Sequence, residues 1–178
     1  MKCLLPAILA CALILGAAGP RVTRVSLAAM EKSMDKRVGR LIPEDPYLLI
    51  GYTRGIYVQE YGAVFTFEVN LVASAALSPF GRTSFTKEEI AKLREKKQQR
   101  VFQLKQSMRE MMMASAASLD AVPAEERIVV GASILYYNWE DTTGLPRQIV
   151  MQAQRKHLIA AIKGDRAVLD SELRVQEY

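Results

Sequence analysis

The carboxylates Glu140 and Asp141 come nearest, among the residues of this chain, to a catalytic pair. They stand in the stretch NWEDTTG, in a turn between two expected strands. Paired carboxylates act as general acid and base in many enzymes, and oxygen-rich turns can hold calcium. The spacing matches no EF-hand loop, and Asp-Thr-Thr-Gly differs from the Asp-Thr-Gly of aspartic proteases. We favour a polar hairpin turn, and keep as an alternative a carboxylate-dependent hydrolase with its site at the turn from Trp139 to Gly144.

Other catalytic and metal-binding groups are scarce. The only histidine, His157, lies in QRKHL on an expected short helix, and no Gly-x-Ser-x-Gly turn accompanies it. We therefore favour a solvated helix residue over a member of a Ser-His-Asp triad. The methionines at positions 111–113 point about 100° apart on a helix, so we expect core packing with Met108 rather than a copper(I) site. The sequence predicts no metal and no cofactor.

A line of basic residues is the most unusual feature of the sequence. Lys92, Lys96 and Arg100 recur every four residues on an expected helix, with Arg94 and Lys97 beside them. Like charges at this spacing destabilise a helix by about 0.2–0.5 kcal/mol per pair. One interpretation is a solvated face, and we expect this middle stretch to be the least buried part of the helix. The other is that Lys92, Lys96, Lys97 and Arg100 bind lipid headgroups, envelope polymers or an acidic partner protein.

Aromatic residues gather near the ends of the expected strands. Outward rings can stack on a sugar or on another chain, whereas inward rings belong to the core. We favour packing, and keep a small-molecule or sugar binder as a further alternative. The residues are Tyr52, Tyr57, Tyr61, Tyr136, Tyr137 and Trp139.

The first residues resemble a secretory signal peptide. A lysine at position 2, an apolar run and small residues up to position 19 follow one another, and the run is too short for a comfortable transmembrane helix. Cleavage after Ala18 removes Cys3 and Cys11, the only cysteines, so we expect no disulfide and no catalytic thiol in the mature chain. Two alternatives stay open: an uncleaved anchor through residues 3–18, and lipidation at Cys11.

Composition indicates a globular protein of one domain. The 178 residues are 50% hydrophobic and 24% charged, with a formal net charge of +5. This charge favours anionic surfaces but is far from that of a nucleic-acid-binding protein. We expect a non-catalytic periplasmic or secreted protein that binds a protein partner or an anionic envelope component, with peripheral membrane contact possible. Neither the ligand nor the oligomeric state follows from the sequence.

The periodicity of apolar residues predicts an α+β fold. We expect a helix over residues 24–41, a strand over 47–52, a turn near Arg54 and Gly55, and a longer strand to residue 71. A capping box at Thr86 and Glu89 begins a helix over 87–119, continuous or broken near ASAAS. Strands over 127–139 and 147–153, a short helix over 155–163 and a strand over 167–178 follow. These elements predict an antiparallel sheet of four to five strands packed against a long helix in two layers. The expected divisions are a signal peptide (1–18), a helix and linker (19–45) and a single domain (46–178).

Overall fold

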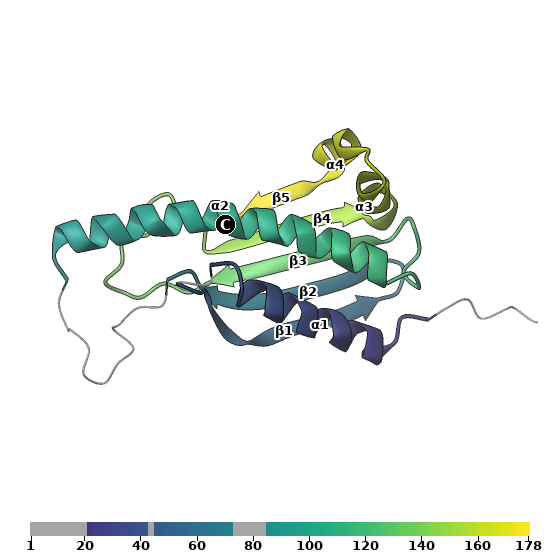
Figure 1. The fold of residues 1–178 in the computed structure, drawn as a ribbon, viewed down its shortest axis with the longest axis horizontal. Coiled ribbons are helices and arrows are strands. Elements are labelled where there is room, and N and C mark those ends of the chain that lie inside the picture. The colour runs from purple at the N-terminus through teal and green to yellow at the C-terminus, as the bar shows by residue number, and fades with distance from the viewer. Residues whose placement is uncertain (1–20, 43–44, 73–84) are drawn as a thin grey trace, which may run out of the picture.

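The computed structural model describes residues 21–42, 45–72 and 85–178, which form a sheet and a layer of helices over one of its faces (Figure 1). The strand order in the sheet is β1-β2-β3-β4-β5. This confirms the expected α+β class and the packing of a long helix on a sheet. In chain order the elements are α1 (Arg24–Val38), β1 (Leu48–Val58), β2 (Gly62–Asn70), α2 (Lys87–Ser118), β3 (Arg127–Ile134), β4 (Gln148–Gln154), α3 (Arg155–Ile162), α4 (Arg166–Glu172) and β5 (Arg174–Glu177).

The sheet is mixed, so the expectation of a purely antiparallel sheet was wrong. β2 and β3 are parallel, whereas the other neighbouring strands are antiparallel. Helix α2 joins β2 to β3 and carries the chain back along the sheet, so that β3 begins at the same end as β2. Sequence analysis placed the strands in adjacent runs and did not recognise this strand–helix–strand crossover.

Helix α2 is one continuous helix of 32 residues and does not break near ASAAS. At 1.5 Å per residue it is roughly 48 Å long, and its N-terminal part extends past the sheet (Figure 1). The predicted capping box is present, because Thr86 accepts from the backbone of Glu89 and the Glu89 side chain accepts from that of Thr86. Met108, Met111 and Met112 are buried, as expected of core residues.

β1 and β2 form one long hairpin, and the turn predicted near Arg54 and Gly55 was wrong. β1 continues through this stretch with a shift in register between Ile50 and Arg54, which is a bulge within the strand. The chain turns after Val58 instead. Gly62 follows that turn with φ 134°, and a Cβ there would lie 1.9 Å from the carbonyl oxygen of Arg127, so only glycine fits.

The C-terminal strand predicted over 167–178 was wrong in its first half. Residues Arg166–Glu172 form helix α4, and only Arg174–Glu177 form β5 at the edge of the sheet. The side chain of Asp165 caps this helix by accepting from the backbone of Val168 at 3.4 Å. Leu169 then turns into the core, which fixes the segment as a helix.

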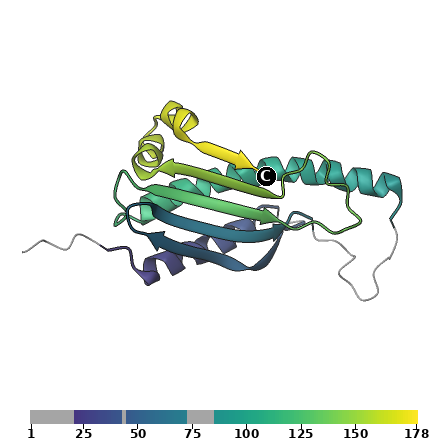
Figure 2. The ribbon, with the colours of Figure 1, turned by 180° about the vertical axis from the view of Figure 1, so that it is seen from behind.

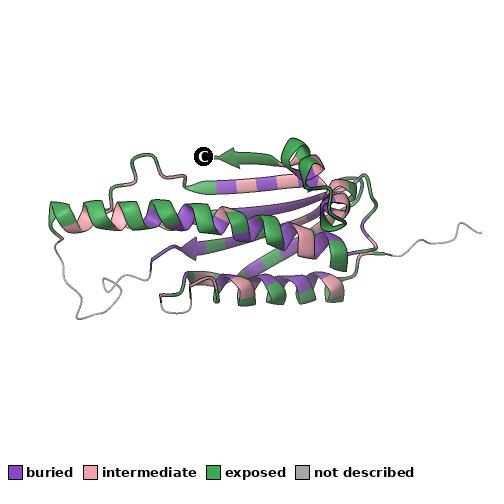
Figure 3. Ribbon diagram, turned by 45° about the horizontal axis from the view of Figure 1, so that its top comes forward, coloured by how far each residue is buried: buried purple, intermediate pink, exposed green. Residues whose placement is uncertain are grey.

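One face of the sheet is buried beneath the helices and the other is open. The alternation predicted for β2 is confirmed, since Ala63, Phe65, Phe67 and Val69 are all buried on the helix side. β3 was expected to be covered on both faces, and residues 128–132 are buried, including Val129 on the face opposite the helices; Ser133 is exposed on that face. Helices α1 and α2 both lie behind the sheet in Figure 2, and Figure 3 shows where the buried residues run along the strands.

Candidate functional site

The basic line of α2 does not form an exposed cationic face. The side chains of Lys97 and Arg100 are only 1% and 4% exposed, so the expectation that this stretch is the least buried part of the helix was wrong. Lys96 pairs with Asp45. Of the four candidate anion-binding residues, Lys92 and Lys96 stay exposed. Segments far away in the sequence cover Lys97 and Arg100, which periodicity along one helix cannot reveal.

Lys97 forms a buried ion pair with Glu140, the first of the two predicted catalytic carboxylates. The side chain of Glu140 is 3% exposed, and the ammonium of Lys97 also approaches the carbonyl of Leu135 at 3.5 Å. Burial lowers the pKa of Lys97, and the hydrogen bond that Lys97 donates to Glu140 opposes that shift. The ammonium lies 4.7 Å from the ring centre of Tyr136, and burial raises the pKa of that phenol to about 12. The pair fastens the 135–147 loop onto α2.

Arg100 joins α2 to the chain on either side of the first hairpin. It donates to the carbonyl of Leu71 and to the carboxylate of Asp45, and its guanidinium lies 5.3 Å from the ring centre of Tyr47. The Tyr47 hydroxyl donates back to the carbonyl of Arg100 at 3.0 Å. A hydrogen bond from Lys96 is the main reason why the pKa of Asp45 is lowered. Asp45 is therefore held as an anion between two cations of α2.

The turn from Trp139 to Gly144 is fixed to α2 by further contacts. Arg94 donates to the carbonyl of Thr143 at 2.9 Å and lies 3.8 Å from the carboxylate of Asp141. The ring of Trp139 stacks on that of Phe85, with 3.9 Å between centroids. Together with the Lys97–Glu140 pair, these contacts hold the turn against the projecting half of α2.

Glu140 and Asp141 are poorly placed for acid–base catalysis. Glu140 is buried and its charge is matched by Lys97. Hydrogen bonds from Thr143 lower the pKa of Asp141, with a smaller contribution from Arg94, whereas a catalytic acid needs a raised pKa. Both carboxylates thus act as partners of α2 in the described structure.

The aromatic residues form two groups at opposite ends of the sheet. Tyr57 and Tyr61 lie at the end where β2 and β3 begin, whereas Tyr137 and Trp139 follow the end of β3. The Tyr57 hydroxyl donates to Glu126 at 3.2 Å, and Tyr137 stacks on Trp139 with 6.0 Å between centroids. No single aromatic platform is formed from the two groups.

The described residues hold no cluster of three or more histidine, cysteine or acidic side chains arranged to bind a metal. His157 is half-buried on α3, and its Nδ1 lies 3.6 Å from a carboxylate oxygen of Glu172. Within the same part of the chain, no helix is long and apolar enough to cross a bilayer. Residues 1–20, which carry the predicted signal peptide and Cys11, lie outside the described residues.

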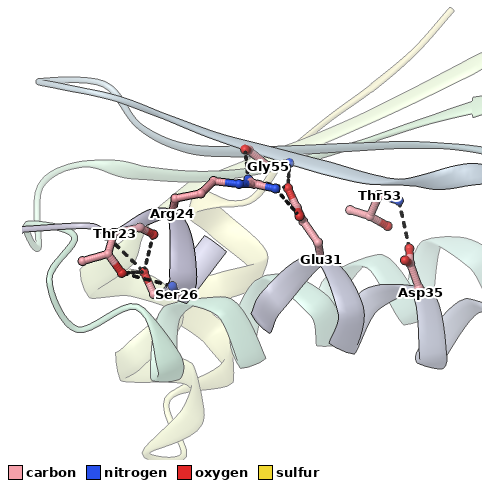
Figure 4. A network of polar contacts seen from close by, with 7 residues as sticks. All are labelled: Thr23, Arg24, Ser26, Glu31, Asp35, Thr53 and Gly55. Atoms are coloured by element: carbon pink, nitrogen blue, oxygen red, sulfur yellow. Dashed lines mark hydrogen bonds and ion pairs between the residues drawn. The ribbon is translucent and has the colours of Figure 1, made fainter. Parts of the chain in front are cut away.

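Helix α1 closes the outer edge of the sheet with charged side chains, a feature that sequence analysis missed (Figure 4). Glu31 accepts from the backbone N–H of Gly55 at 2.7 Å, and Asp35 accepts from that of Thr53 at 2.9 Å. Arg24 donates to both Glu31 and the carbonyl of Gly55. These bonds occupy backbone groups of edge strand β1 that another strand would otherwise pair with. The hydrogen bond from Arg24 lowers the pKa of Glu31.

The open face of the sheet carries apolar side chains at the β1–β2 end. The open face is the sheet face opposite α1 and α2. Ile56, Val64 and Val129 are direct neighbours in one row across three strands, and Val58 lies beside them on β1. Ile56 is 58% exposed and Val58 is 44% exposed, whereas Val129 is 6% exposed, so the open apolar surface lies on β1. The solvated face of a sheet is ordinarily polar. A contiguous apolar row on it therefore indicates an interaction surface, which a single exposed apolar residue does not.

Basic residues surround this row on the open face. Arg54 on β1, Arg127 on β3 and Arg174 on β5 lie on that face by register, and Glu68 on β2 is the acidic residue among them. The sequence did carry a signal for the apolar row. Three consecutive residues of β1 are apolar or aromatic: Ile56, Tyr57 and Val58. Successive residues of a strand point to opposite faces, so this stretch places an apolar or aromatic side chain on both faces of the sheet.

The fold and these surfaces define a two-layer α+β domain with a mixed sheet that is open on one face. No family model, curated protein or solved structure matches the chain.

Proposed function

We propose that this chain is an exported, non-catalytic module of a bacterial envelope or periplasm that binds a partner protein through the open face of its sheet. The observation that carries the proposal is the apolar row Ile56–Val64–Val129 on that face, with Val58 beside it. Ile56 and Val58 are its solvent-exposed members, whereas Val129 is buried. Protein interfaces combine such an apolar centre with a polar rim. The module needs no reactive group for this role.

The partner's surface is apolar at its centre and acidic around it. Arg54, Arg127 and Arg174 outnumber Glu68 on the open face, and the whole chain carries a formal charge of +5. Opposite charges at the rim of an interface speed association and disfavour wrong partners. A second copy of this chain presents the same basic rim, so it is a poor occupant of this face.

Docking on the open face explains the structure better than addition of a partner strand, because both edges of the sheet are protected. The backbone of β1 near Gly55 is already bonded to α1. β5 at the other edge is four residues long and carries two charged side chains. Short, charged edge strands resist pairing with another strand.

An anionic envelope surface is supported less than a protein partner. That alternative depended on Lys92, Lys96, Lys97 and Arg100 as a free cationic line, and internal ion pairs occupy three of the four. The hydrolase alternative likewise loses Glu140 to its pair with Lys97.

Export is proposed from the N-terminal sequence pattern, with cleavage after Ala18. Mass spectrometry of the chain recovered from its own cells tests this. A periplasmic or secreted product that starts at Gly19 supports export, and a cytosolic product that retains Met1 contradicts it.

Co-purification with matched variants tests the partner interface. Ile56→Asp places a charge in the apolar row, and Phe102→Asp places one at an equally exposed apolar residue of α2, which is 61% exposed. We expect a stoichiometric partner that is lost from Ile56→Asp and retained by Phe102→Asp, with both variants folded by circular dichroism. Equal retention by both variants contradicts the proposal.

A further inference from the structure

A small polar concavity lies on the open face at the end of the sheet where α3 begins. Its volume is ≈ 180 Å³, and its lining consists of Arg127, Gln152, Ala153, Gln154, Glu172 and Arg174. Pockets for drug-sized ligands are typically about 300–1,000 Å³, so this one suits a small group. It does not include the apolar row, whose residues lie on β1, β2 and β3.

Two guanidinium groups and one amide converge on this concavity because of strand register. Gln152 on β4 pairs directly with Arg174 on β5, and Arg127 on β3 pairs with the next open-face position of β4, Gln154. Arg127 donates to the side-chain oxygen of Gln152 at 2.9 Å. That bond occupies the oxygen of Gln152 and leaves its NH₂ group as a donor.

The positive charge of the concavity is not balanced within the described structure. Arg174 forms no ion pair among the residues described. The guanidinium of Arg127 contacts Gln152 and, at 5.9 Å, the ring of Tyr61, and it also forms no ion pair there. The acidic residue of the lining, Glu172, has His157 as its closest charged partner. Arg127 and Arg174 line the same small concavity, so their like charges repel, and an anion between them removes that cost.

We propose that this concavity binds a small oxyanion, a carboxylate or a phosphate, between Arg127 and Arg174. Planar guanidinium groups offer paired N–H donors that match the oxygens of either anion, and Gln152 adds a neutral donor between them. The oxyanion comes either from a free solute or from the carboxylate at the end of a peptide chain. The site stands on its own lining and does not depend on the apolar row.

Titration of the full chain, followed by amide chemical shifts in NMR, tests the site. The probes are inorganic phosphate, acetyl-Ala-Ala with a free carboxylate, and the same dipeptide as its amide. Chloride holds the ionic strength constant, because salt screens exposed charges. The variants are Arg174→Gln and a matched control, Arg166→Gln, which removes the same charge from an exposed position on α4 outside the concavity.

We expect saturable shifts around Arg127 and Gln152 with phosphate, with the free dipeptide, or with both, and none with the amide. Arg174→Gln should weaken binding at least about tenfold, and Arg166→Gln should leave it unchanged. Binding of phosphate alone indicates a solute, and binding of the dipeptide acid alone indicates a chain end. Absence of saturable shifts with both anions, or equal weakening by the two variants, overturns the proposal.

Discussion

Replacing Lys97 with methionine should be among the most destabilising single substitutions in α2. Methionine matches the length of the lysine stem, so the packing is retained while the charge is lost. Glu140, whose side chain is 3% exposed, is then left as a buried anion without its partner. Breaking a buried ion pair in this way costs about 3–5 kcal/mol, against a total stability of about 5–15 kcal/mol for a typical domain.

The double variant Lys97→Met/Glu140→Leu separates lost charge from lost packing. Both charges are removed together, so no group is left buried and unpaired, and the double variant should recover most of the loss. The matched control is Lys92→Met on the same helix, where the side chain is exposed and a change within about 0.5 kcal/mol is expected.

Urea denaturation followed by circular dichroism measures all four proteins. The reasoning predicts a large fall in the free energy of unfolding for Lys97→Met, a small one for Lys92→Met, and a double variant closer to the parent than Lys97→Met is. If Lys97→Met and Lys92→Met cost the same, the pair is solvated and the stated role of Glu140 is wrong.

Three further outcomes follow from the α1 contacts and the hairpin. Gly55→Ala should lower the melting temperature with a loss of about 1–3 kcal/mol, because a Cβ there lies 2.6 Å from the ring of Phe65; an unchanged melting temperature contradicts that packing. Glu31 has a lowered pKa, so its contribution to stability is present above its ordinary pKa of 4.5 and is lost as the pH falls through the folded value. The difference in urea midpoint between the parent and Glu31→Gln should therefore shrink on acidification, and a constant difference argues against the bond from Arg24. Gly62→Ala should prevent the close approach of β2 to Arg127, and soluble, fully folded protein from this variant speaks against the register described.

Helices α1, α2 and α3 and the inward face of β2 could be predicted from the sequence because their signals are local, whereas α4 was predicted as a strand. Thr86 and Glu89 lie three residues apart and form the capping box that begins α2. Phe65, Phe67 and Val69 alternate with polar residues and are buried on one face. Such patterns need no knowledge of what lies across the fold.

Long-range pairing could not be predicted in the same way. Lys97 was read as solvated because lysine interrupts the apolar stripe of α2, and its partner Glu140 comes 43 residues later, in a turn whose position depends on the crossover. The same holds for Arg100 and Asp45. The mixed sheet was missed for a related reason, since nothing local distinguishes a crossover helix from one that joins two hairpins.

The candidate site residues were the part of the prediction most affected by unrecognised long-range pairing. Lys97 and Glu140 were assigned to two different candidate sites, one binding and one catalytic, and the structure brings them together as one ion pair. The open face was missed because a turn was predicted near Arg54 and Gly55, so Ile56 and Val58 were not placed on one face of β1.

Photo-crosslinking in the cells that produce the protein tests the central claim most directly. A photoreactive amino acid at position 56 or 58 reports on the apolar row, and the same residue at position 102 reports on an equally exposed site of α2. The account predicts a discrete adduct with a different protein from positions 56 and 58 and none from position 102. Adducts from all three positions alike, or only dimers of this chain, would contradict it.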